Sequence, residues 1–196
     1  MSYVEFNRVS IPTRLSWQQG CQAIAHGRFW FLLVLSLGTT SNVIYTCTVP
    51  LAGFGAIAGA TLPRRRALTV IFSMWFINQL LGFTVRQYPW TLSTVAWGPV
   101  LLLGAVLAGL LGNQKPAVSQ RGFTGYGIWL SIALMVGFVA YQAVIGLASL
   151  VLGGIENFTL PIVWDVFVGN MVWAIALIGI HCILIWNARR RKIGIA

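Results

Sequence analysis

Acidic side chains are almost absent from this chain. Its 196 residues contain 3 Asp and Glu against 13 Lys and Arg, and charged residues make up only 8% of the sequence. A soluble globular domain usually carries about 25% charged residues. Because 58% of the residues are hydrophobic, the composition instead predicts an integral membrane protein.

Residues that carry most enzyme chemistry are equally scarce. The acids are Glu5, Glu156 and Asp165, and the histidines are His26 and His181. The two histidines lie toward one set of ends of the apolar runs, and Glu156 and Asp165 lie toward the other set. Histidine and acid are therefore not at the same depth, and no Ser–His–Asp triad can be assembled. HExxH, GxSxG and Walker motifs are absent, and no set of metal ligands is clustered. We therefore expect no enzymatic activity, no metal site and no cofactor.

The isolated thiols and the second histidine are expected to be structural. Cys21, Cys47 and Cys182 are odd in number and have no CxxC spacing, so we expect free thiols without a disulfide framework. His181 lies within the last apolar run, where a polar side chain is expected to form a hydrogen bond to a neighbouring helix.

What the sequence does contain is a regular distribution of basic residues between long apolar runs. Twelve of the 13 Lys and Arg residues lie in alternate gaps, and only Arg86 lies in the other set. Short cytoplasmic loops retain Lys and Arg, because basic residues resist translocation. The basic residues border apolar runs, which argues against nucleic-acid binding. The pattern predicts an all-α integral membrane protein, a six-transmembrane-helix bundle with both termini in the cytoplasm (N-in/C-in).

The expected organisation is one domain with two short flanking segments. Residues 1–28 form a cytoplasmic or interfacial segment, residues 29–187 form the transmembrane domain, and residues 188–196 form a basic cytoplasmic tail. Within residues 1–28, a short amphipathic helix with Pro12 near its start and a flexible tail are both compatible with the pattern. The six crossings are expected at residues 29–47, 50–62, 67–85, 94–111, 126–152 and 161–187.

The second apolar segment is the shortest. About 13 residues can form a re-entrant hairpin or a buried helix as well as a crossing. A hairpin would leave Arg64, Arg65 and Arg66 on the outer side, against the charge rule, so we expect a short, complete crossing. Ala52, Ala56 and Ala60 form a small-residue stripe, and we expect other helices to enclose this segment.

Polar and aromatic residues gather at the outer side of this topology. One interpretation is an interfacial aromatic belt with a rim ion pair, and the other is an outward-facing pocket with aromatic walls and a few polar groups. The candidate substrate-binding residues are Asn42, Tyr45, Asn78, Arg86, Tyr88, Trp97, Gln142, Trp164, Asp165 and Asn170. Trp97, Trp164 and Tyr88 would stack on a ligand, and the polar side chains would orient it.

The layout resembles the substrate-binding S components of energy-coupling-factor vitamin transporters. These proteins also have six short helices in under 200 residues, with a small-residue second helix followed by an arginine-rich turn. The sequence similarity lies in VPLAGFGAIAGATLPRRRALTVIFSMWFINQLLGF (Val49 to Phe83). Two departures are that related proteins often carry an acid at the position of Asn78, and that the usual alanine-rich signature of the first helix is not evident.

The resemblance implies a function and partners. In that family a vitamin or its precursor binds near the outer face, and a transmembrane coupling protein with two ATPase subunits drives uptake. We therefore expect a non-enzymatic protein of the bacterial inner (plasma) membrane that captures a small metabolite. The alternative is a non-catalytic structural or assembly subunit of a larger membrane complex, which the close-packing glycines also fit.

Overall fold

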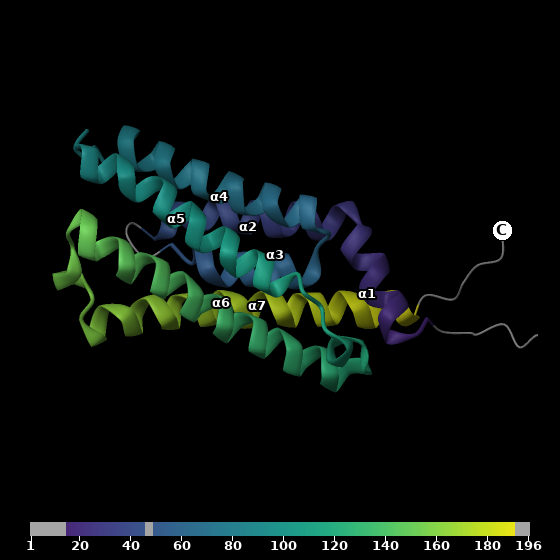
Figure 1. Cartoon of the computed structure of the whole chain (residues 1–196). Helices are drawn as coiled ribbons and strands as arrows, with labels where there is room; N and C mark the ends of the chain where they lie inside the picture. Colours follow the sequence, from purple (N-terminus) through teal and green to yellow (C-terminus); the bar gives the residue numbers. More distant parts are fainter. Residues whose placement is uncertain (1–14, 46–48, 191–196) are drawn as a thin grey trace, which may run out of the picture.

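Every regular element of residues 15–45 and 49–190, the part of the chain that the computed structural model describes, is helical (Figure 1). The α-helices are α1 (Trp17–His26), α2 (Arg28–Ile44), α3 (Leu51–Thr61), α4 (Arg64–Thr84), α5 (Leu92–Gly112), α6 (Gly122–Leu152) and α7 (Leu160–Arg190). Two short 3-10 helices, η1 (Ala117–Gln120) and η2 (Ile155–Asn157), lie in the loops on either side of α6. The predicted all-α fold is confirmed, and α2 to α7 correspond one by one to the predicted apolar segments.

The long helices have the length and surface of membrane-spanning segments. α4, α5, α6 and α7 are each long and apolar enough to cross a bilayer, and α1 with α2 forms a fifth candidate that is bent by 64°. Large apolar side chains such as Phe72, Leu103, Val139 and Ile175 point away from the bundle and are exposed. An apolar surface of this extent is unfavourable in water and suits lipid. The protein is a multi-pass membrane protein.

Contacts at the helix ends show how the chain runs through the bundle. Arg66, at the start of α4, contacts the backbone just before α2, and Arg86, after α4, contacts the backbone at the end of α2. α2 and α4 therefore run in the same direction, and α3 brings the chain back between them. Ser93 donates a hydrogen bond to the carbonyl of Leu152, so the start of α5 lies beside the end of α6. We call the end with Arg66, Lys115 and Arg189 the basic end, and the end with Arg86 and Glu156 the opposite end.

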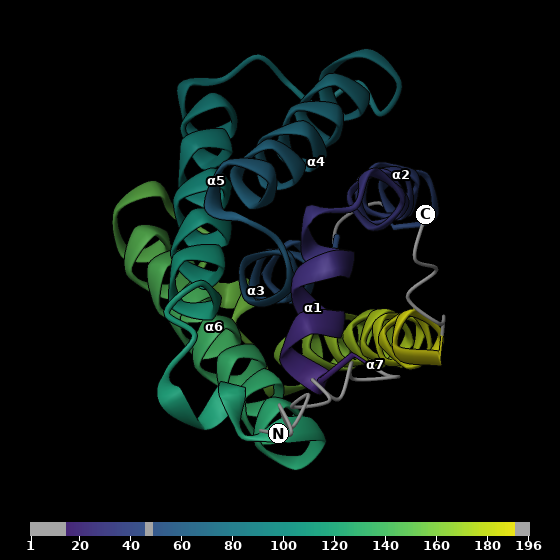
Figure 2. The ribbon, with the colours of Figure 1, turned by 90° about the vertical axis from the view of Figure 1, so that its right-hand side faces the viewer.

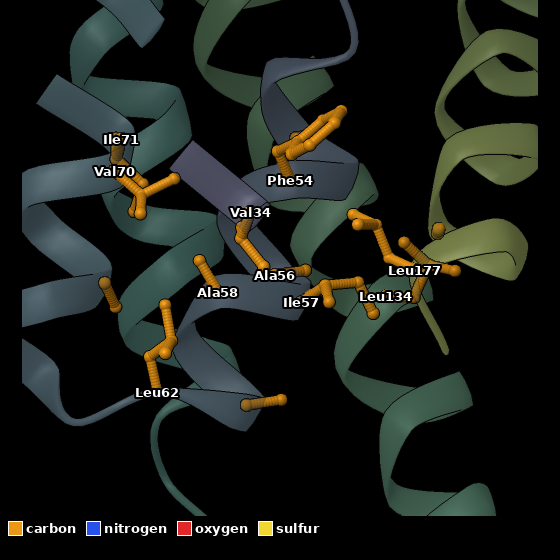
Figure 3. Close-up of a cluster of buried hydrophobic side chains, with 14 of the residues drawn as sticks. Val34, Phe54, Ala56, Ile57, Ala58, Leu62, Val70, Ile71, Leu134 and Leu177 are labelled. Carbon is orange, nitrogen blue, oxygen red and sulfur yellow. The ribbon is translucent and has the colours of Figure 1, made fainter. Parts of the chain in front are cut away.

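α3 forms the centre of the bundle. All of its residues are buried, and α4, α5, α6 and α7 pack around it (Figure 2). Figure 3 shows Ile57 and Ala58 of α3 among side chains of the surrounding helices, including Val34, Val70 and Leu134. The expectation that the short, small-sided segment is enclosed by other helices is confirmed.

Small residues allow α3 to touch its neighbours at the backbone. A Cβ atom on Gly59 would collide with the carbonyl oxygen of Gly109 in α5, and one on Gly55 would lie 2.8 Å from the carbonyl oxygen of Ala105. The side chain of Asn113 donates to the carbonyl of Gly59 over 2.9 Å. The α3–α5 contact therefore depends on glycine at these positions.

α1 lies across the basic end of the bundle and packs against α7 (Figure 1). It begins with a capping box, in which Ser16 Oγ accepts from the amide of Gln19 and Gln19 Oε1 accepts from the amide of Ser16. The ring of Trp17 is buried. Of the two alternatives for residues 1–28, the structure shows a short helix over Trp17–His26, while Pro12 lies outside the described residues. At the other terminus, α7 continues to Arg190, so its helix extends into the predicted 188–196 tail.

Candidate functional site

A cavity of about 190 Å³ opens at the opposite end, between α5, α6 and α7. Trp97 lines it from α5, Tyr141 and Gln142 line it from α6, and Phe158 lines it from the loop before α7. Tyr141 is buried, and its ring fits against Gly104 of α5. Two of the ten candidate binding residues, Trp97 and Gln142, thus meet in one small cavity with mostly apolar walls.

Three further candidates meet in a separate contact at the same end. The guanidinium of Arg86 donates to the backbone carbonyls of Asn42 and Tyr45, the latter over 2.8 Å. These carbonyls lie at the C-terminal end of α2, where the last carbonyls of the helix have no intrahelical donor and attract a cation. The contact ties α4 to α2 and holds the guanidinium beside the end of that helix. Asn42 is buried, and its amide donates to carbonyls of its own helix.

Asn170 joins α7 to the central helix. Its Oδ1 accepts a hydrogen bond of 2.6 Å from the backbone amide of Gly53, and its amide donates to the carbonyl of Val166. The amide of Gly53 is one of the first in α3, and such amides lack partners within their own helix. The fully buried side chain of Asn170 therefore caps α3 and does not reach the cavity.

The remaining four candidates are not among the residues that line the cavity. Tyr88 packs against Gly82 and lies 6.4 Å from the ring of Phe83, and Asn78 is half-buried on α4. Trp164 is 59% exposed, and Asp165 beside it is exposed as well. The ten predicted residues therefore do not form one site. Two line the cavity, three take part in the contact of Arg86 with the end of α2, one caps α3, and four lie elsewhere on α4, α7 and the loop after α4.

A second and larger cavity, of about 390 Å³, lies at the basic end. Trp17, Tyr126 and His181 line its buried part, and Lys115 and Trp129 also face it. Sequence reasoning missed this cavity because its residues come from four separate segments. The one available signal was His181, a polar residue deep in an apolar run. Its predicted role in a helix–helix hydrogen bond is confirmed, since Nδ1 lies 3.0 Å from the hydroxyl of Tyr126.

The titratable groups at the basic end are shifted by partial burial. Burial raises the pKa of the Cys21 thiol to about 11, which keeps it protonated at neutral pH. Partial desolvation of its ammonium lowers the pKa of Lys115 from its ordinary value. Cys21 and Cys182 are free thiols, as predicted, and Cys47 lies outside the described residues. Within residues 15–45 and 49–190, no three His, Cys, Asp or Glu side chains are grouped as a metal site would require.

No protein-family model, no curated protein and no solved structure matches this chain.

Proposed function

We propose that the protein crosses the bacterial plasma membrane six times, with the basic end in the cytoplasm. Two independent features support this topology. The Lys and Arg residues fall almost entirely in alternate loops, and the helix-end contacts place the starts of α2 and α4 at one end. In this arrangement α3 carries the chain back across the bundle. Because other helices enclose α3, its neighbours can satisfy the backbone groups at its ends, and the helix does not have to be as long as the lipid layer is thick.

We further propose that it captures a small metabolite at its outer face, in the manner of the S components that its layout resembles. The observation that carries this proposal is the cavity between α5, α6 and α7 at the opposite end. A dry cavity of about 150 Å³ holds one benzene molecule, so a space of about 190 Å³ suits a single ring or a group of that size. The bound group would thus be one ring of a vitamin or vitamin precursor.

The lining residues would make two kinds of contact with the ligand, aromatic and polar. Trp97, Tyr141 and Phe158 offer aromatic surface from three different segments, which suits a flat and partly aromatic group. Gln142 supplies an amide that can both donate and accept, so it would fix the orientation of the ring. Phe158 lies in the loop before α7, so movement of that loop would admit the ligand. A coupling protein with ATPase subunits would drive its release into the cell.

Ligand retention tests this function. The full-length protein is purified in a mild detergent, and the small molecules that it releases on denaturation are identified by mass spectrometry. A panel of vitamins and precursors is then tested for thermal stabilisation, which should reach about 2.7 kcal/mol at a ligand concentration 100 times Kd. Trp97→Ala and Gln142→Leu should abolish this stabilisation, whereas Trp164→Ala, an exposed change at the same end, should preserve it.

The same purification also tests the alternative function, that of an assembly subunit of a larger membrane complex. A protein that retains no small molecule, gains no stability from any compound and co-purifies with large membrane partners would contradict the capture function and favour the subunit. Co-purification of an ATPase module with a bound metabolite would support capture.

A further inference from the structure

Three residues that line the cavity at the basic end carry a buried nitrogen atom without a hydrogen-bond partner among the described residues. Four buried side-chain polar atoms lack a hydrogen bond among the described residues, and three of them belong to residues that line this cavity. They are Nε1 of Trp17, Nε1 of Trp129 and Nε2 of His181. The side chains of Trp17 and His181 are 8% and 1% exposed. Buried polar atoms without a partner are rare, because each costs free energy, so three such atoms on residues of one cavity make this cavity a candidate binding site.

Two of the three nitrogens, those of Trp17 and Trp129, are hydrogen-bond donors, because an indole nitrogen can only donate. Nε2 of His181 is a donor in the tautomer whose Nδ1 accepts from the Tyr126 hydroxyl, and an acceptor in the tautomer whose Nδ1 donates to it. In the first tautomer the residues that line the cavity carry three neutral donors.

The fourth donor is positively charged. The ammonium of Lys115, which faces the same cavity, donates one hydrogen bond to the carbonyl of Leu62 and has two further hydrogens. The guanidinium of Arg189 lies 5.7 Å from the ring of Trp17 and adds positive potential. The acids of the described residues, Glu156 and Asp165, belong to the opposite end. The cavity therefore combines donors with a positive field, and no carboxylate of the described residues balances it.

Aromatic contacts hold the donors in place. The rings of Trp30 and His181 lie 4.6 Å apart, and Trp30 is itself anchored by a hydrogen bond from Nε1 to the hydroxyl of Thr61. Trp17 makes edge contacts with Phe123 and Tyr126. Side chains fixed in this way form a site before the ligand arrives, which reduces the ordering cost of binding.

We propose that this cavity binds a phosphate group that enters from the basic end, either on a lipid headgroup or on a soluble molecule. A phosphate offers several strong acceptor oxygens and negative charge, which complement three neutral donors and one ammonium. The proposal concerns the end of the bundle away from Trp97 and Gln142, so it holds or fails independently of metabolite capture.

Thermal unfolding of the full-length protein tests this proposal. The protein is purified in a maltoside detergent without lipid or phosphate, and either inorganic phosphate or phosphatidylglycerol is added. Sodium chloride at equal ionic strength and diacylglycerol serve as the respective controls. Stabilisation by inorganic phosphate identifies a soluble ligand, and stabilisation by phosphatidylglycerol alone identifies a lipid headgroup. Either result supports the site.

Matched variants locate the binding. Trp129→Phe keeps the aromatic ring and removes one donor, and Lys115→Gln removes the charge. Each should weaken the apparent affinity about tenfold or more, as expected for the loss of one hydrogen bond to a charged group. Trp164→Phe and Arg121→Gln make the same chemical changes outside the cavity and should leave the affinity unchanged. If Trp129→Phe fails to fold, Trp17→Phe removes a different indole donor.

Two results would overturn the proposal. One is that neither phosphate nor phosphatidylglycerol stabilises the wild-type protein beyond its control. The other is that both cavity variants bind as tightly as the wild type.

Discussion

Basic and amide side chains in this protein bind the carboxyl ends of neighbouring helices. Arg66 donates to the carbonyls of His26 and Gly27, at the C-terminal end of α1, and Arg86 donates to those at the end of α2. Lys115 donates to the carbonyl of Leu62, just after α3. The last carbonyls of a helix have no partner within it, and a cation compensates both this deficit and the helix dipole. Single residues thus join helices that the loops alone would leave loosely connected.

Arg86 gives the first prediction at this scale. Arg86→Gln removes the charge from the end of α2, and we expect it to lower the free energy of unfolding by about 1–3 kcal/mol. Unfolding in sodium dodecyl sulfate, followed by far-UV circular dichroism, measures the change. Arg121→Gln, which alters an exposed arginine in the basic-end loop, should change the stability by less than about 0.5 kcal/mol. Equal stabilities of the two variants would show that the Arg86 contacts contribute nothing.

Asn170 gives the second prediction at the scale of single residues. Asn170→Ala leaves the buried amide of Gly53 without an acceptor, and we expect a loss of about 1–3 kcal/mol in the same unfolding measurement. Asn187→Ala is the matched control, because it makes the same change at an exposed position of the same helix. Comparable effects at both positions would mean that the cap on α3 has no energetic role.

Cys21 gives a prediction for pH dependence. Its pKa of about 11 lies above the ordinary thiol value of about 8.5, so the reactive thiolate is scarcer than usual between these two pH values. In a variant with Cys47 and Cys182 changed to serine, the rate of maleimide alkylation should rise about tenfold per pH unit from pH 8 to 10. Glutathione, measured in parallel, should level off near pH 9. A plateau at that pH for Cys21 would show an ordinary thiol.

At the scale of elements, α3 is held by its neighbours and not by its own propensity. It has 11 residues with several glycines, and a helix of this length is marginal in isolation. Its glycines lower helix propensity, yet they permit backbone contacts with α5 that no larger residue allows. Close packing of this kind is a major source of helix association within a membrane.

The prediction at this scale compares glycines. Gly59→Ala places a methyl group against the carbonyl of Gly109, so α3 and α5 must separate, and we expect a loss of about 1–3 kcal/mol. Gly127→Ala in α6 meets nothing within 4 Å and should be neutral or stabilising by up to about 1 kcal/mol. Detergent unfolding of both variants measures the difference. If Gly59→Ala is as stable as Gly127→Ala, the α3–α5 contact is not close packed.

At the scale of the whole molecule, the two ends differ in chemistry. The basic end carries the larger cavity with its nitrogen donors, and the opposite end carries the smaller, mostly apolar one. Between them, large apolar side chains cover the outer faces of the long helices. A bilayer around this middle zone would leave one cavity near each membrane surface.

The proposed topology predicts which sites a membrane-impermeant maleimide can reach. In a variant without native cysteines, Thr91→Cys at the opposite end should react in intact cells. Gln120→Cys, exposed at the basic end, should react only after the cells are lysed. The reverse pattern would place the basic end outside. Labelling of both sites in intact cells would contradict a crossing of the membrane by α5, the one α-helix between them.

Several features of the candidate sites followed from local sequence and others did not. The sequence places Trp97 and Gln142 near the outer ends of their helices, and the structure brings both to one cavity, while their binding of a ligand stays a prediction. The same reasoning could not show that Asn170 instead accepts from Gly53, 117 residues away in the sequence. It also could not foresee Arg86 at the end of α2, 44 residues from Asn42. Hydrogen-bond partners at such separations depend on how the helices pack.

The sequence by itself determined the helical class, the apolar segments and the enclosure of the short second one. Lipid forces each spanning segment to satisfy its own backbone, so length, hydropathy and small-residue content are sufficient signals. Only the tertiary structure decided which polar side chains cap helices and which face a cavity. That choice depends on the rotation of each helix about its axis and on its neighbours. It separated Asn170 from Gln142 at one end, and at the other it brought Trp17, Trp129 and His181 around a single space.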